Sequence, residues 1–423
     1  MKAIVSNDMI EATRLTRQGR LIEASALLQR ALTGAGPKES AAPAQSPARW
    51  SASSNQPRIV DIDPDTGRPV AEIGTVAKPA HGGMAAGDFP IAAGPGHIAM
   101  PAAMPAALRG FIGKIIEGGS TQTASLRTAE APPDGAQFVQ RSFDSAIGNR
   151  SYKLYIPSTY RSEPAPLIVM LHGCTQSPDD FASGTRMNML AEEFGCLVAY
   201  PGQTQAANAQ KCWNWFNPAD QTRDQGEPAL IAGITRQIMQ NHAVDPKRVY
   251  VAGLSAGGAA AAIMAQAYPD LYAAAGVHSG LACGAARDMP SAFAAMRQGA
   301  ATSQRSGRGP AMDGSRRIVP TIVFHSDNDH TVHPRNGDQV IAQSAGAGGL
   351  RTEVQQGQVQ GGHAYSLTIH ADAAGQPVLE QWLVHGGGHA WSGGSPAGSF
   401  TDPRGPDASR EMLRFFLEHP RSA

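Results

Sequence analysis

The architecture of this chain can be read from one segment, Val249-Tyr-Val-Ala-Gly-Leu-Ser255-Ala-Gly-Gly258. β-Branched and aromatic residues, which favour a strand, lead into the pattern Gly-x-Ser-x-Gly, and an alanine-rich helical segment follows at once. A turn this tight needs glycine on both sides of the serine. The segment therefore predicts that Ser255 is a nucleophile at a strand-to-helix turn, beside the free N–H groups that begin the helix.

Short apolar runs and helical stretches alternate on both sides of this segment. Runs suited to buried parallel strands occupy residues 167–171, 197–200, 249–252, 321–324 and 381–384. Helical spacing is clearest over residues 227–241, 259–267 and 409–418. This order predicts an α/β fold with an open, mostly parallel sheet covered by helices on both faces. In such sheets the reactive side chains collect at the carboxyl ends of the strands.

A nucleophilic serine needs a histidine base, and the histidine needs an acid that orients it. An apolar run ending near residue 325 leads into an acidic loop, where Asp329 is the predicted acid and Asp327 the alternative. His389 lies in a glycine-rich loop directly after the last apolar run and is the predicted base. His385 falls inside that run and is predicted to be structural.

The oxyanion hole is predicted from the run Leu167-Ile-Val-Met-Leu, which ends in His172-Gly-Cys174. We expect the backbone N–H groups of Cys174 and Ala256 to bind the negative oxygen of the reacting ester. The backbone supplies the donor, so the thiol of Cys174 needs no chemical role; a cysteine nucleophile paired with His172 is the weaker alternative.

Three tryptophans are predicted substrate contacts: Trp213 and Trp215 in the segment Trp-Asn-Trp-Phe, and Trp391 beside the predicted base. Aromatic side chains in an exposed loop at a strand end suit an apolar acyl chain. Packing into the core is the alternative interpretation.

The four cysteines, Cys174, Cys196, Cys212 and Cys283, match neither a dense disulfide framework nor a Cys-x-x-Cys motif. They allow up to two disulfides, and reduced thiols fit equally well. The start Met1-Lys-Ala-Ile-Val runs into polar residues, without the apolar run of a secretory signal. These features favour the cytoplasm, with an extracellular location as the alternative.

The chain divides into three predicted parts. Residues 1–33 form a helical hairpin, because apolar residues recur at helical spacing on both sides of Gly19. Residues 34–136 are a linker rich in Pro, Gly and Ala with short ordered islands, and residues 137–423 form the catalytic domain. Self-association or partner binding is predicted through residues 9–32.

Charge and hydropathy limit the partners. The chain carries 35 basic and 35 acidic side chains, which argues against nucleic acid as a partner. No uninterrupted apolar stretch approaches the ~18 residues of a membrane span. The motifs imply neither a metal nor an organic cofactor, and a small ester or oligoester is the predicted partner.

Several motifs occur together and in order along the chain. They are His172-Gly-Cys-Thr-Gln, Cys212-Trp-Asn-Trp-Phe, Gly253-Leu-Ser-Ala-Gly-Gly, Gly280-Leu-Ala-Cys-Gly, His325-x-x-x-Asp-x-x-Val and Gly387-Gly-His-Ala-Trp-Ser-Gly-Gly. Over about residues 140–420 this set resembles the poly(3-hydroxybutyrate) depolymerase esterase family. The resemblance implies an α/β-hydrolase fold and serine-esterase chemistry, with the catalytic roles on Ser255, Asp329 and His389.

Two features depart from that family. Ser326 stands where the family usually has glycine, and the chain ends at Ala423 without the binding domain that polymer-degrading members generally add. We therefore expect hydrolysis of hydroxybutyrate oligomers or small esters through an acyl-enzyme, with attack on solid polymer less favoured. The alternatives are a feruloyl or acetylxylan esterase, transfer of the acyl group to an alcohol, and a non-catalytic interaction protein on a hydrolase scaffold.

Overall fold

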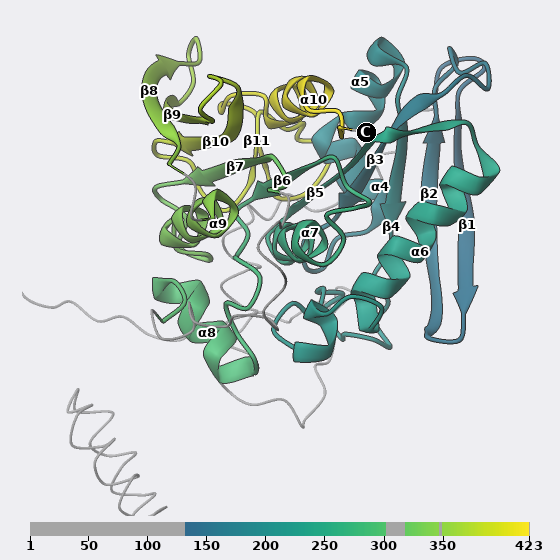
Figure 1. Cartoon of the computed structure of the whole chain (residues 1–423), viewed down its shortest axis with the longest axis horizontal. Helices are drawn as coiled ribbons and strands as arrows, with labels where there is room; N and C mark the ends of the chain where they lie inside the picture. Colours follow the sequence, from purple (N-terminus) through teal and green to yellow (C-terminus); the bar gives the residue numbers. More distant parts are fainter. Residues whose placement is uncertain (1–131, 302–317, 347–348, 423) are drawn as a thin grey trace, which may run out of the picture. The chain divides into compact units, whose positions relative to one another are not determined.

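The computed structural model describes residues 132–301, 318–346 and 349–422 (Figure 1). The predicted hairpin at residues 1–33 and nearly all of the predicted linker at residues 34–136 lie outside these ranges. The association predicted for residues 9–32 therefore stays a prediction, as do the three domain boundaries.

The described residues form one large mixed sheet in the strand order β1-β2-β4-β3-β5-β6-β7-β10-β9-β8. In chain order the strands are β1 (Gln137–Ser145), β2 (Gly148–Ile156), β3 (Ala165–Leu171), β4 (Leu197–Pro201), β5 (Val244–Leu254), β6 (Ala274–His278), β7 (Thr321–Ser326), β8 (Arg351–Gln358), β9 (Ala364–Ala371) and β10 (Pro377–Val384). The six strands from β4 to β10 in the sheet order pair in parallel. Antiparallel pairing adds β2 and β1 at one edge, and β9 and β8 at the other.

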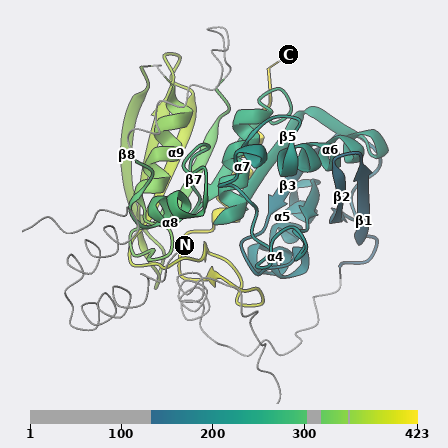
Figure 2. The same cartoon turned by 90° about the horizontal axis from the view of Figure 1, so that it is seen from below.

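Helices cover both faces of this sheet (Figure 2). They are α4 (Pro178–Thr185), α5 (Met187–Phe194), α6 (Gly226–Asn241), α7 (Ala256–Ala267), α8 (Met289–Gln298), α9 (Arg335–Ala345) and α10 (Ala408–Glu418), with a short 3₁₀ turn, η1 (Pro218–Gln221). A small second sheet pairs β11 (Trp391–Ser392) with β12 (Thr401–Asp402). Within the described ranges, no helix has the length and apolar character that crossing a membrane requires.

The alternation of side chains along β3 shows how the two faces are filled. Leu167, Val169 and Leu171 join the apolar cluster that contains residues of α6 and α7. Ile168 and Met170 point the other way and join the cluster that contains residues of α4, α5 and α10. A parallel strand buried on both faces is apolar throughout, and all seven residues of β3 are buried.

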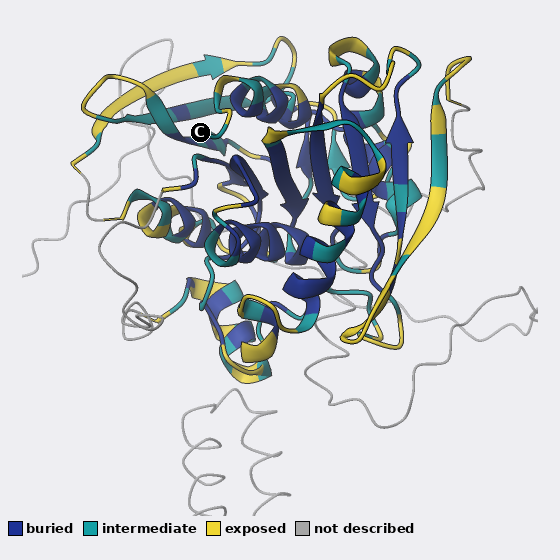
Figure 3. Cartoon of the chain, turned by 45° about the vertical axis from the view of Figure 1, so that its right-hand side comes forward, coloured by how far each residue is buried: buried dark blue, intermediate teal, exposed yellow. Residues whose placement is uncertain are grey.

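Burial decreases from the centre of the sheet toward its edges (Figure 3). The five residues of β4 and the five of β6 are all buried, whereas β8 is exposed at nearly every position. The predicted α/β fold is confirmed, and each of the five predicted strand runs lies within a strand of the central sheet. The parallel strands bring their carboxyl ends, and the loops that follow them, to one edge of the sheet.

Candidate active site

Ser255 lies between the end of β5 and the start of α7, with backbone angles φ 57° and ψ −118°. A residue with a side chain adopts such a positive φ only at a cost in free energy, so the surrounding structure must hold it in place. A Cβ at Gly253 would overlap the carbonyl of Gly257, and a Cβ at Gly257 would overlap the carbonyl of Leu171. Close backbone packing therefore explains why the serine is flanked by glycine.

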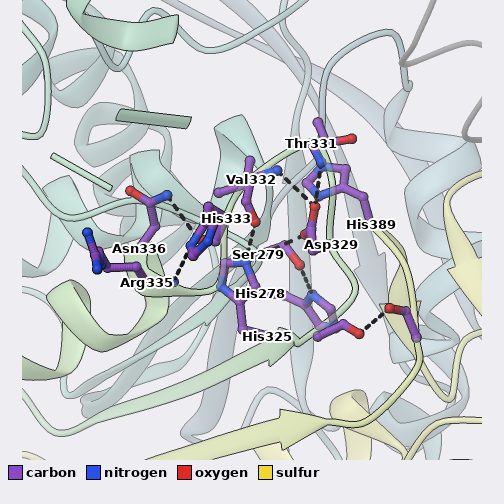
Figure 4. Close-up of polar contacts among 12 residues, drawn as sticks. His278, Ser279, His325, Asp329, Thr331, Val332, His333, Arg335, Asn336 and His389 are labelled. Carbon is purple, nitrogen blue, oxygen red and sulfur yellow. Dashed lines mark hydrogen bonds and ion pairs between the residues drawn. The ribbon is translucent and has the colours of Figure 1, made fainter. Parts of the chain in front are cut away.

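His389, which is partly buried, and Asp329, which is buried, form a hydrogen-bonded pair at the same edge of the sheet (Figure 4). The Nδ1 of His389 lies 2.7 Å from Oδ2 of Asp329, and the His389 side chain is 11% exposed. The other carboxylate oxygen accepts hydrogen bonds from the backbone N–H groups of Thr331 and Val332, at 2.9 and 2.8 Å. With Nδ1 held by the carboxylate, Nε2 of His389 is the nitrogen available for proton transfer.

The electrostatics of Asp329 favour its charged form. Burial by itself raises the pKa of this carboxyl, but the charge and hydrogen bond of His389, the charge of His325 and the N–H of Val332 outweigh it and lower the pKa to about 2. The acid is therefore ionised at neutral pH, which is the state that orients and stabilises a protonated imidazole. The alternative acid, Asp327, lies against His385 and not against His389.

His325 stabilises the loop that carries Asp329. Its ring is fully buried, and Nε2 donates to the carbonyl of Val332 at 2.7 Å while lying 3.6 Å from Oδ2 of Asp329. Burial lowers the pKa of His325, although the neighbouring carboxylate of Asp329 acts in the opposite direction. The contact closes the turn that carries Asp329.

His278 connects the nucleophile turn to the segment that follows the base. Its backbone carbonyl accepts from the N–H of Ser255 at 2.9 Å, and its ring Nε2 accepts from the N–H of Ser392 at 2.9 Å. The ring stacks on Trp391, with centroids 4.9 Å apart. Burial lowers the pKa of His278 to about 3, so it remains a neutral acceptor. Sequence reasoning missed this residue, because its role depends on segments far apart in the chain.

In the loop after β3, the backbone N–H groups of Gly173 and Thr175 are hydrogen-bonded within the protein, and Cys174 lies between them. The N–H of Gly173 donates to Oε1 of Gln176 at 2.9 Å, and the N–H of Thr175 donates to the carbonyl of Gln210 at 2.7 Å. For Cys174, between them, no hydrogen bond from the N–H to another described residue is seen. Ala256 is the first residue of α7, where backbone N–H groups have no partner within the helix. The N–H groups of Cys174 and Ala256 therefore remain the predicted oxyanion donors.

A disulfide between Cys174 and Cys212 joins this loop to the segment after β4, with Cα atoms 4.2 Å apart. The same segment also contacts His172, directly after β3. Nε1 of Trp213 donates to the backbone carbonyl of His172 at 3.1 Å, and the N–H of Gln203 donates to Nε2 of the His172 ring at 3.0 Å. Burial lowers the pKa of His172 to about 4. The sulfur of Cys174 is thereby bonded, and the ring of His172 is held as a neutral structural group.

Glu227, near the start of α6, holds the segment after β4 through hydrogen bonds. Its carboxylate accepts from the backbone N–H of Asn214 at 2.7 Å, from Nδ2 of Asn214 at 2.8 Å and from Nε2 of Gln203. Burial raises the pKa of Glu227 to about 7. Nε2 of Gln203 also donates to the carbonyl of Cys212, so Gln203 connects Glu227 to the disulfide. No sequence motif marked this glutamate.

The predicted aromatic platform is corrected by the structure. Trp213 is 0% exposed, Trp215 6% and Trp391 1%, so none of the three lies in an exposed loop. Nε1 of Trp391 donates to Oγ of Ser409 at 3.0 Å, which fixes this ring in the core beneath α10. The rings of Trp213 and Trp391 each donate to a buried acceptor, and sequence clustering alone does not show this.

Among the described residues, no group of three or more His, Cys, Asp and Glu side chains is arranged to hold a metal ion. Ser255, Asp329 and His389 follow the carboxyl ends of β5, β7 and β10, in the chain order serine, acid, histidine. This fold and this chain order are those of the α/β-hydrolase class.

Comparison with known proteins shows what this chain is similar to. The family model described as "Esterase PHB depolymerase" matches residues 150–356, a range that contains Ser255 and Asp329 but ends before His389. This match covers just under half of the chain, which is similar to the family over that range.

Individual relatives differ in their named substrates. The poly(3-hydroxyalkanoate) depolymerase C of Paucimonas lemoignei is 34% identical over 254 residues, covering 59% of this chain and 60% of its own length. Feruloyl esterase B of Thermothelomyces thermophilus is 29% identical over 246 residues, covering 56% of this chain and 79% of its own. The chain thus spans less than two thirds of the depolymerase. The solved acetyl xylan esterase of Aspergillus awamori shares the fold, with TM-score 0.53, 22% identity and coverage of 66% of this chain and 99% of that one.

Proposed function

We propose that this chain hydrolyses esters of short 3-hydroxyalkanoic acids, such as hydroxybutyrate oligomers or the polymer, through an acyl-enzyme on Ser255. The observation that carries the proposal is the 2.7 Å bond between Nδ1 of His389 and Asp329, at the sheet edge where Ser255 is held at a positive φ. A serine at a strained turn and an oriented base are the two requirements of nucleophilic catalysis by a hydroxyl group.

The reaction proceeds in two balanced halves. Nε2 of His389 accepts the hydroxyl proton of Ser255 as its oxygen attacks the ester carbonyl, and the N–H groups of Cys174 and Ala256 bind the oxyanion. His389 then returns the proton to the leaving alcohol, and the acyl group stays on the serine. Water repeats these steps and releases the carboxylic acid and free Ser255. Asp329 holds the imidazole in the required tautomer throughout.

The choice of substrate rests on the relatives. The depolymerase is 34% identical to this chain and the feruloyl esterase 29%, which supports hydroxyalkanoate esters. The second candidate is a feruloyl or acetylxylan type of carbohydrate esterase. This candidate is favoured by the share of each relative that aligns with the chain, which is 79% for the feruloyl esterase and 60% for the depolymerase.

An ester panel tests both candidates. We expect the highest kcat/KM with hydroxybutyrate trimer, lower values with methyl ferulate and acetylated xylo-oligosaccharide, and loss of all three activities in Ser255→Ala. A higher kcat/KM on either carbohydrate ester would favour the second candidate. Turnover by Ser255→Ala at the wild-type rate would refute the acyl-enzyme.

Two further experiments address the remaining alternatives. A fluorophosphonate probe should label Ser255, and failure to label the wild type would support a non-catalytic interaction protein. Product analysis with added alcohols separates hydrolysis from acyl transfer. For the location, the disulfide supports the extracellular alternative over the cytoplasm, because disulfides persist in oxidising compartments.

A further inference from the structure

A second serine, histidine and aspartate trio lies beside the pair of His389 and Asp329. Oγ of Ser366 is 2.9 Å from Nε2 of His385, and Nδ1 of His385 is 2.8 Å from Oδ2 of Asp327. Ser366 belongs to β9, His385 follows β10 and Asp327 follows β7. The trio therefore ties together the ends of three strands.

This trio lacks the surroundings of a second nucleophile. Ser366 lies within β9, in register with Gln356 of β8 and Leu383 of β10. In the part of the chain that the structure describes, no helix begins next to it, so no row of free N–H groups faces its hydroxyl. The bonds of the trio are better explained by the other hydrogen bonds of Asp327, which involve the backbone of the neighbouring loop.

Asp327 binds the backbone of the loop that carries the base. Its second carboxylate oxygen, Oδ1, accepts from the N–H of Gly386 at 2.8 Å, and its own N–H donates to the carbonyl of Val384 at 3.1 Å. The hydroxyl of the preceding Ser326 lies within hydrogen-bond reach of the carbonyls of Val384 and Gly387. The last residue of β7 and the residue after it thus contact Val384, at the end of β10, and three residues of the loop that follows: His385, Gly386 and Gly387.

The loop needs such contacts because of its composition. Residues 386–388 are all glycine, and Gly386 has φ 81°. Glycine has no side chain to pack and loses more conformational entropy on ordering than any other residue. His389 follows these glycines directly, so the position of its ring depends on how the glycine backbone is held from outside.

We propose that Asp327 is a positioning residue that fixes His389 by holding the N–H of Gly386. The proposal rests on the function proposed above, because it requires His389 as the base. The essential property of Asp327 is then a hydrogen-bond acceptor at Oδ1 and not a negative charge. Asp329 differs in this respect, since its charge stabilises the protonated imidazole.

Two replacements of Asp327 separate these properties. Asp327→Asn keeps an amide oxygen that accepts from Gly386, and Asp327→Ala removes the acceptor. His385→Ala removes the imidazole and leaves the bond between Asp327 and Gly386. Asp329→Asn and Ser255→Ala serve as matched controls in which the catalytic acid and the nucleophile are lost.

The assay measures kcat and KM on p-nitrophenyl butyrate, together with the urea midpoint of each full-length variant. We expect Asp327→Ala to lower kcat about 10- to 100-fold, as a misplaced catalytic group does, with KM unchanged. Asp327→Asn and His385→Ala should keep most of the wild-type kcat, and Asp329→Asn should lose nearly all of it. Because Asp327 is 42% exposed, the urea midpoints should stay close to that of the wild type.

The proposal is overturned by a wild-type kcat in Asp327→Ala, or by an effect confined to KM. It is also overturned if Asp327→Asn or His385→Ala lowers kcat about 10-fold or more relative to the wild type, a comparison that does not require the alanine variant at position 327 to fold. Turnover by Ser255→Ala would instead refute the proposed function. The two failures are therefore distinguishable.

Discussion

Removing the disulfide between Cys174 and Cys212 should weaken both stability and catalysis. The bridge spans 38 residues of sequence, and a closed loop of this size lowers the entropy of the unfolded chain by the equivalent of about 4 kcal/mol. The double variant Cys174→Ala/Cys212→Ala should lose up to this much free energy of unfolding. For a domain of this size that corresponds to a fall in Tm of roughly 10 °C.

The same variant should turn over esters more slowly at a temperature where it remains folded. Complete loss of one oxyanion donor costs about 100- to 1,000-fold in kcat. The bond between Thr175 and Gln210 survives and still restrains the loop, so we expect a smaller decrease, about tenfold. Treatment of the wild type with dithiothreitol should reproduce the effect.

Urea denaturation and kcat on p-nitrophenyl butyrate measure the two effects separately. The single variants provide the control: Cys212→Ala retains the thiol of Cys174, so a thiol nucleophile would leave it active while Cys174→Ala would be inactive. Our reasoning predicts equal losses in both. Unchanged urea midpoint and kcat in the double variant would refute it.

Three buried groups lead to further predictions. Burial lowers the pKa of His172 to about 4 and of His278 to about 3, whereas both bind a proton near pH 6.5 in the unfolded chain. The free energy of unfolding should therefore fall as the pH drops below about 6.5, by about 1.4 kcal/mol per pH unit for each histidine until its folded pKa is reached. Equal urea midpoints at pH 7 and pH 5 would contradict this. Glu227→Gln places an amide among three hydrogen-bond donors and should cost about 1–3 kcal/mol of stability, seen as a lower urea midpoint; an unchanged midpoint would show that the carboxylate is not needed.

The parts of the fold that were predicted are those with a local signal. Residues 249–258 combine a strand pattern, a glycine-flanked serine and a helix pattern within one short segment, and the structure has β5, the turn and α7 there. β6 was not predicted, because Ala274-Ala-Gly-Val-His278 lacks the β-branched run of its neighbours. Its Gly276 lies under α10, where a Cβ would contact Met412. Small residues are required there by a packing contact that the local sequence does not show.

In the candidate site, too, the residues within local motifs were predicted, whereas those that depend on distant segments were not. Ser255, Asp329 and His389 were placed by motifs, and the structure brings Asp329 and His389 into contact. Glu227 and His278 were missed because their partners lie in other segments of the chain. The pairing of the cysteines stayed open, since it depends on which Cα atoms come close in the fold. Burial of the tryptophans was predicted wrongly for a similar reason: a cluster of aromatic residues indicates neither the face nor the depth at which the rings lie.

The two contacts of His278 offer a practical use. One residue accepts from the backbone on both sides of the reaction centre, so the nucleophile turn and the segment at β11 are ordered together. A molecule in which this C-terminal segment has come loose should also lose the geometry that makes its serine reactive. Stoichiometric labelling with a fluorophosphonate would then count the fully assembled molecules in a preparation and serve as a quality measure during purification or storage.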